Sequence, residues 1–100
     1  MRKKQLLWSD RALNEYENLV DYLWNEWGET VTTRIVSEIE ETIIRIQKKP
    51  EQFPIIIKDK VIRRCVFSPQ TSIYFRINDD TVEIISLFDN RQNPKKLKGL

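Results

Sequence analysis

Apolar positions recur with two different periods along the chain, and the change of period divides it into two halves. In the first half they recur every three or four positions, which is the spacing of one face of a helix. Ser9 and Asp10 precede this stripe as an N-cap and an acidic first turn, and Gly28 follows it as a stop signal. The pattern predicts a first helix between Ser9 and Gly28. Its apolar stripe consists of Leu13, Tyr16, Val20, Leu23, Trp24 and Trp27.

A second helical stripe begins almost at once. Thr30 is a suitable cap for it, Lys48 and Lys49 suit the negative end of its dipole, and Pro50 stops it. Two amphipathic helices joined by so short a turn are expected to pack as an antiparallel hairpin. The apolar stripe of this second helix consists of Ile35, Val36, Ile39, Ile43 and Ile46.

The second half of the chain is rich in β-branched and aromatic residues, as in "IIIKDKVIRRCVF", "SIYFRI" and "VEIISLF". Ser68–Gln70 and Asn78–Asp80 separate these segments as turns, and strands joined by such short turns must run antiparallel. Side chains alternate along a strand, so one face of the middle segment is apolar and the other carries polar groups. The first face holds Ile73, Phe75 and Ile77, and the second holds Tyr74 and Arg76.

The short segment "QLLW" near the start predicts one more strand beside the others. The sequence therefore predicts an α+β domain, in which a helical hairpin packs on one face of an antiparallel sheet of about four strands. At 100 residues, with 40% hydrophobic residues, a single domain over residues 1–100 is expected.

Composition excludes several kinds of site. The chain has one cysteine and no histidine, which rules out an internal disulfide, a Cys/His zinc site and any triad with a histidine base. No apolar run approaches the roughly 20 residues that span a bilayer. We therefore expect a cytoplasmic protein with no metal, no cofactor and no membrane partner.

Charge is distributed unevenly. Residues 1–29 carry four basic and six acidic side chains, whereas residues 55–100 carry nine basic and five acidic ones. The C-terminal half is thus the better contact for an anionic partner, although a merely solvated surface explains the same excess.

Four arginines in that half are candidate target-binding residues. Arg63 and Arg64 are adjacent in a strand, so they point to opposite faces, and only one can reach a functional surface. Arg76 shares a face with Tyr74, with which it could bind phosphate by stacking and charge. A cross-strand salt bridge from Arg76 to Glu83 is the simpler alternative. Arg91 follows the last strand in a polar loop.

Trp24 and Trp27 have two interpretations. Large aromatic residues at helical spacing usually pack in a core, but these two could also border a groove for a partner peptide. Cys65 is interpreted as a small buried residue within its strand.

The order of these parts resembles the RelE/ParE family of bacterial type II toxins, from Leu7 to about Leu97. The segments that carry the resemblance are a helix ending in "WG", a second helix ending before "KKPEQFP", strands containing "IRR" and "IYFRI", and the final "VEIISLFDNRQNP". The resemblance implies a toxin that is neutralised by a cognate antitoxin, whose C-terminal peptide wraps over the helices and sheet.

Members of this family differ in their target. RelE-like toxins cleave messenger RNA on the ribosome with basic side chains and a proton-transferring residue near the C-terminus, whereas ParE-like toxins poison DNA gyrase. Arg91 matches the family's arginine after the last strand, and Arg63 or Arg64 matches a basic position on the preceding strand. Where the nucleases place an arginine and a C-terminal tyrosine, this chain has Ser72 and Leu97.

With that set incomplete and no histidine to replace it, the sequence predicts a ParE-like toxin that binds a macromolecular target rather than an enzyme. No catalytic residue is assigned. The alternatives are a RelE-like ribosome-dependent endoribonuclease and an inactive homologue that serves as an antitoxin-binding module.

Overall fold

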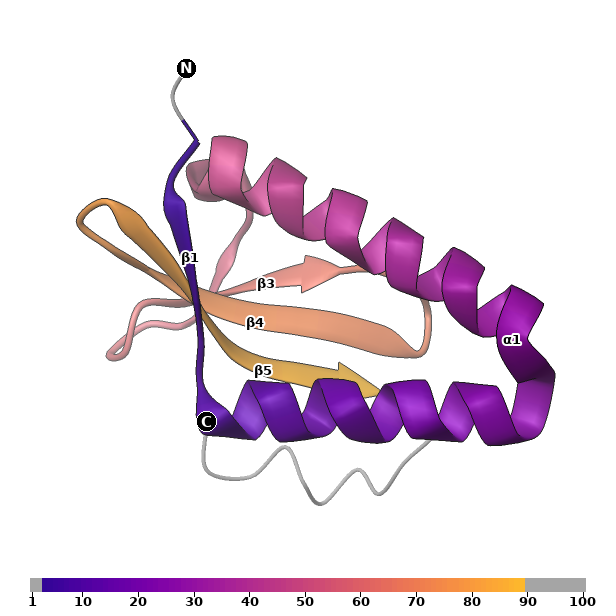
Figure 1. The fold of residues 1–100 in the computed structure, drawn as a ribbon. Helices are drawn as coiled ribbons and strands as arrows, with labels where there is room; N and C mark the ends of the chain where they lie inside the picture. Colours follow the sequence, from indigo (N-terminus) through magenta and orange to yellow (C-terminus); the bar gives the residue numbers. More distant parts are fainter. Residues whose placement is uncertain (1–2, 90–100) are drawn as a thin grey trace.

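The computed structural model describes residues 3–89, which form an α+β fold with one long helix packed on a five-stranded sheet (Figure 1). The strands lie in the order β1-β5-β4-β3-β2. The elements in chain order are β1 (Gln5–Trp8), α1 (Asp10–Lys48), the 3-10 helix η1 (Pro50–Gln52), β2 (Ile55–Ile57), β3 (Ile62–Val66), β4 (Thr71–Asn78) and β5 (Thr81–Asp89).

The predicted class is confirmed, but the sheet has five strands and is mixed rather than antiparallel. The segment predicted as one strand, "IIIKDKVIRRCVF", is divided into β2 and β3 by a turn that the Val61 N–H closes on the Lys58 carbonyl. β1 pairs with β5 in parallel, whereas the other neighbours are antiparallel. Only tight turns force the antiparallel direction, and β1 is separated from every other strand by the whole of α1.

The predicted pair of helices is one helix, α1, with a sharp bend at Gly28. Gly28 has φ 82° and ψ −175°, and it is the only residue inside α1 with non-helical angles, so no loop separates the two parts. A positive φ of this kind is readily adopted by glycine because it has no Cβ. Residues 10–27 are called here the first arm and residues 29–48 the second arm; they diverge from the bend instead of packing as a closed hairpin (Figure 1).

The ends of α1 agree with the sequence signals. The Ser9 hydroxyl accepts a hydrogen bond from the Ala12 N–H at 3.0 Å, which is the predicted N-cap. The Ser9 hydroxyl also donates to the Ile85 carbonyl at 2.8 Å, so the cap fixes the start of α1 to β5. Thr30, predicted as a second cap, lies inside the helix.

The sheet has two faces with different contents. Alternation along β4 is as predicted: Ile73 and Phe75 are fully buried under α1, while Tyr74 belongs to a smaller cluster with Ile62 and Phe88 on the other face. The main core consists of Ala12, Leu19, Leu23, Ile39, Ile43, Ile46, Cys65, Ile73, Phe75, Val82, Ile84 and Leu87.

The first arm buries a different stripe from the predicted one. Leu23 is buried as expected, but its buried partners are Ala12 and Leu19. Trp24 and Trp27 are 53% and 60% exposed, so their interpretation as core residues is wrong. The apolar sector of this arm is wider than the area that the sheet covers, and a period of three to four residues does not say which edge of a wide sector faces inward.

Candidate target-binding face

The face of the sheet opposite α1 holds three of the predicted site residues, Arg64, Tyr74 and Arg76, which are called here the basic face. Arg64 pairs across the strands with Tyr74, and Arg76 lies two residues further along β4 on the same side. The two arginines are therefore diagonal neighbours, which typically lie about 7–8 Å apart, and somewhat less between their Cβ atoms.

Arg64 is the member of this face whose charge is available. It is exposed, and its guanidinium makes no hydrogen bond or ion pair with any residue between 3 and 89. Its backbone N–H bonds to the Pro54 carbonyl at 3.1 Å, which fixes the position of the strand while leaving the side chain free to turn.

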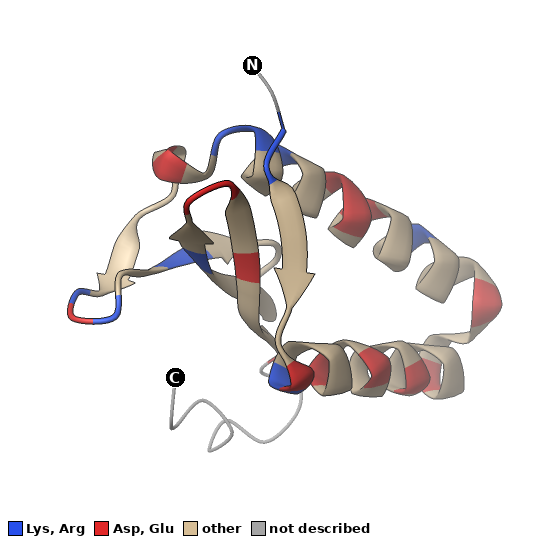
Figure 2. Ribbon diagram, turned by 60° about the vertical axis from the view of Figure 1, so that its left-hand side comes forward, with Lys and Arg blue, Asp and Glu red and all other residues tan. Residues whose placement is uncertain are grey.

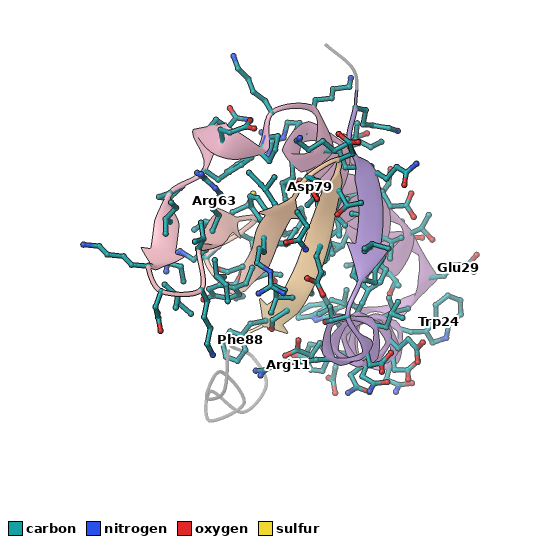
Figure 3. All side chains as sticks on the ribbon, turned by 90° about the vertical axis from the view of Figure 1, so that its left-hand side faces the viewer. Arg11, Trp24, Glu29, Arg63, Asp79 and Phe88 are labelled. Atoms are coloured by element: carbon teal, nitrogen blue, oxygen red, sulfur yellow. The ribbon has the colours of Figure 1, made fainter. Side chains whose placement is uncertain are left out.

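Arg63, its neighbour in sequence, points to the other side of the sheet. Its Nη1 donates to the carbonyls of Phe53 at 2.7 Å and Glu51 at 3.2 Å, and its Nε is buried with no partner among the described residues (Figure 3). The sequence left open which of the two arginines reaches a functional surface. The register directs Arg63 to η1 and the residue after it, and leaves the Arg64 side chain exposed on the basic face.

Arg76 is half-buried and paired. Its Nη2 lies 2.9 Å from Glu83 Oε1, directly across the strands, so the salt bridge that was the simpler interpretation is present. Asn78 donates to the same carboxylate oxygen at 3.2 Å. An external anion has to compete with Glu83 for this guanidinium.

Tyr74 is 6% exposed and packs between Ile62 and Phe88. A phenol in this position supports the floor of the basic face and does not offer its ring for stacking. Arg91 and Leu97 lie outside the described residues. Ser72 is half-buried and pairs with Phe88.

A polar network at the end of β5 was not predicted. The register between β4 and β5 shifts after Tyr74, which is a β-bulge, and the Glu15 carboxylate accepts bonds there from the Ser86 hydroxyl at 2.7 Å and the Leu87 N–H at 3.3 Å. Further along, the buried Thr71 hydroxyl donates to the Asp89 carboxylate at 2.7 Å. A bulge of one residue leaves no composition signal, and therefore the sequence pattern could not reveal this network.

The described residues show little sign of covalent or metal chemistry. Burial raises the pKa of the Cys65 thiol, and the nearby positive charge of Arg45 opposes this only in part, so the thiolate form is disfavoured. Among residues 3–89, no cluster of three or more metal-ligating side chains occurs, and no helix is long and apolar enough to cross a membrane. The basic face can bind anions, but it holds no histidine for proton transfer near neutral pH.

Solved structures of bacterial proteins share this fold. A protein of the chromosomal ParDE toxin-antitoxin system from P. aeruginosa aligns with a TM-score of 0.72 at 18% identity, covering 87% of this chain and 96% of that one. A copper-bound mutant toxin from Helicobacter pylori aligns with a TM-score of 0.52 at 19% identity, covering 88% of this chain and 96% of that one. A conserved hypothetical protein from Helicobacter pylori, solved in solution, gives 0.53 at 20% identity, with 89% and 97% covered.

At such low sequence identities, these structural alignments show a shared fold and nothing more. No curated protein sequence matches the chain. Residues 6–94, however, match the family described as the ParE toxin of the type II toxin-antitoxin system parDE. That match spans nearly the whole chain, and the chain therefore belongs to the ParE toxin family.

Proposed function

We propose that this chain inhibits bacterial growth by binding DNA gyrase in the cytoplasm through its basic face, and that a cognate antitoxin neutralises it. The main support for target binding through this face is a difference among the three described arginines of the predicted site. Arg63 and Arg76 are engaged within the molecule, whereas Arg64 is exposed and unpartnered in the described part of the chain. An unpaired guanidinium on a rigid strand is suited to bind carboxylate or phosphate groups.

Binding to a target, without bond-breaking chemistry, follows from the same face. Tyr74 is buried, Ser72 stands where the related nucleases have an arginine, and the chain has no histidine. The basic face can therefore contribute charge and a complementary shape for binding, but it lacks residues for bond-breaking chemistry. The family match favours ParE-like activity over ribosome-dependent cleavage of messenger RNA.

Trp24 and Trp27 support the antitoxin part of the proposal. Both lie on the first arm, and Figure 3 shows Trp24 projecting away from the helix. Tryptophan is strongly enriched among the residues that dominate binding energy at protein interfaces, and two such side chains left exposed on one arm indicate a partner.

The experiment on the target uses induced expression with two readouts. Growth inhibition together with stabilised gyrase cleavage complexes supports the proposal, whereas codon-phased cuts in ribosome-bound messenger RNA would assign the chain to the RNase alternative. Arg64→Ala should abolish most of the growth inhibition. Arg34→Ala is the matched control, because Arg34 is an exposed helix arginine that pairs only with Glu38 in the described part. No growth defect on induction of the wild-type chain would indicate an inactive homologue.

The experiment on the antitoxin determines whether a small protein is encoded beside this chain and whether the two purify together. The double substitution Trp24→Ala and Trp27→Ala should release that protein, because truncating interface tryptophans commonly costs about 2 kcal/mol or more each. An unchanged complex would remove these two residues from the interface.

A further inference from the structure

The basic face carries less positive charge than its two arginines suggest. Arg76 Nη2 lies 2.9 Å from Glu83 Oε1, and these side chains are 40% and 25% exposed, so the two charges offset each other at the surface. Asn78 donates to the same Glu83 oxygen at 3.2 Å, which holds the carboxylate beside Arg76. Arg64 makes no ion pair with any residue between 3 and 89. The net charge of the three ionised side chains therefore equals that of one guanidinium.

Exposed aliphatic side chains lie on the same face. Val66 is two residues beyond Arg64 on β3 and is 59% exposed. Leu7, on β1, pairs with Glu83 and is 52% exposed. Residues two apart on a strand, or directly opposite on neighbouring strands, project from the same side of a sheet. The basic face thus combines one unpaired guanidinium with apolar surface.

The turns that connect the strands add no cationic surface to this face. Figure 2 shows the strands mostly tan, with the blue and red segments concentrated in α1 and in the turns. The two lysines and three aspartates of the strand-connecting turns are Lys58, Lys60, Asp59, Asp79 and Asp80. Lys3 and Lys4, which precede β1, share a polar hollow with Asp80. Positive and negative charges are therefore nearly balanced around the described part of this face.

A nucleic acid is a poor match for such a surface. Proteins that bind nucleic acid neutralise several phosphates, and those that bind single strands also offer exposed aromatic rings on which bases stack. Here Glu83 would repel any phosphate that approached Arg76. The rings of Tyr74 and Phe88 are only 6% and 7% exposed, so they are not available for stacking.

A protein surface matches the same features better. The planar guanidinium of an arginine binds a carboxylate through two parallel hydrogen bonds, and Arg64 is exposed and unpaired among the described residues. Apolar side chains of a partner can pack on Val66 and Leu7. Protein interfaces are typically built in this way, with arginine enriched and other charged residues depleted at their centre.

We propose that the basic face selects protein over nucleic acid: it binds one carboxylate of its target at Arg64, with apolar contacts at Leu7 and Val66, and Glu83 excludes phosphate groups by neutralising Arg76. This inference rests on the proposed function. It adds the chemical character of the bound surface, which belongs to the protein component of the target and not to its DNA.

The first test measures the binding of a fluorescein-labelled DNA duplex of mixed sequence by fluorescence anisotropy at low salt. Glu83→Gln keeps the shape of the side chain and can still accept from Arg76 and Asn78, but it leaves the charge of Arg76 uncompensated. It should lower Kd for the duplex at least about fivefold and make the dependence of Kd on salt steeper by about one phosphate contact.

Glu38→Gln is the matched control for this test. Glu38 is also a glutamate paired with an arginine, Arg34, but it lies on α1, away from the basic face. The substitution changes the net charge equally, and Kd for the duplex should change by less than about twofold.

The second test measures the affinity of the chain for purified DNA gyrase in the absence of DNA. Val66→Lys should raise Kd at least about tenfold, because it places a charge where the target packs an apolar group. Ile44→Lys is the control, since Ile44 is 38% exposed on α1, which covers the other face of the sheet, and the expected change is less than about threefold. The added lysine at position 66 should at the same time tighten binding of the duplex, so the two affinities move in opposite directions.

The outcomes separate this inference from the function on which it rests. If Glu83→Gln and the wild-type chain bind the duplex equally, Glu83 does not exclude nucleic acid and the inference is overturned. Binding to gyrase that requires DNA, or that is unaffected by Val66→Lys, overturns it as well. If the wild-type chain does not bind gyrase at all, the proposed target is wrong, and a gain in duplex affinity for Glu83→Gln then supports the exclusion of nucleic acid independently of that target.

Discussion

The two faces of the sheet use the same kinds of residue for different purposes. On the α1 side, charged groups are engaged within the molecule: Arg63 donates to the carbonyls of Glu51 and Phe53, and Glu15 accepts bonds at the bulge in β5. On the opposite side, Arg64 projects with no partner among the described residues. Arg63 and Arg64 are adjacent, and because they lie on opposite sides of the strand, the first guanidinium is engaged within the molecule and the second is exposed. Substitutions on the first face should change stability, and substitutions on the second should change binding.

Phe75→Ala should have the largest effect, because it removes the centre of the α1 side. The ring is fully buried and meets Phe53 edge-on, with centroids 5.7 Å apart. Truncation of such a residue costs about 3–5 kcal/mol in the free energy of unfolding. Urea denaturation measures it, with Val66→Ala on an exposed position as the control, for which a change within about 0.5 kcal/mol is expected. Comparable losses for both variants would contradict the division between the faces.

Arg63→Ala and Arg64→Ala test the comparison most directly. Loss of Arg63 leaves the carbonyls of Glu51 in η1 and of Phe53 after it without their donor, and we expect a destabilisation of about 1–3 kcal/mol. Loss of exposed Arg64 should change the unfolding free energy by less than about 0.5 kcal/mol. Growth inhibition should be lost in Arg64→Ala and retained in Arg63→Ala, provided that Arg63→Ala is assayed at a temperature at which it is folded. If the two variants proved equally stable, the assignment of Arg63 to a structural role would be wrong.

Glu15→Gln should have a smaller effect. The amide keeps the shape and can still accept from Ser86 and Leu87, but it loses the charge that strengthens these bonds and the contact with Arg11 at 3.6 Å. We expect a loss of about 1 kcal/mol, measured by thermal unfolding. In the Ser86→Ala background the same substitution should cost less, since one of the two bonds is already absent. Equal costs in both backgrounds would show that Glu15 does not act through the bulge.

The features that were predicted correctly from the sequence are those that depend on residues close together in the chain. The α+β class, the Ser9 cap, the strand at Gln5–Trp8 and the alternation along β4 depend on local pattern, and they are confirmed. The parallel direction of β1, the burial of Tyr74 and the exposure of Trp24 depend on contacts between distant segments.

The choice between Arg63 and Arg64 shows the same limit at the candidate site. The sequence established that the two point to opposite faces, but a shift of one residue in register exchanges them. The pairing of Arg64 with Tyr74 and of Arg63 with Phe75 settles this, because Phe75 belongs to the face that α1 covers.

The smallest expected effect is a pH dependence that comes from the α1 side. The pKa of Tyr16 is raised in the folded chain, first by burial and then by the charge of Glu40. The folded state therefore holds the phenolic proton more tightly than the unfolded state does. Its contribution to stability is complete below the ordinary tyrosine pKa of about 10 and is lost as the pH rises through the higher folded value. Burial of Cys65 acts in the same direction and begins at a lower pH.

Tyr16→Phe removes the phenol while keeping a ring that can stack on Trp8. The difference in unfolding free energy between this variant and the wild-type chain should stay constant from neutral pH to about pH 9 and then shift in favour of the variant. Urea denaturation over that range measures the difference directly, and the titration of Cys65 cancels because both proteins contain it. A difference that is flat up to about pH 11 would mean that Tyr16 titrates normally when folded, and that its phenol is better hydrated than its partial burial indicates.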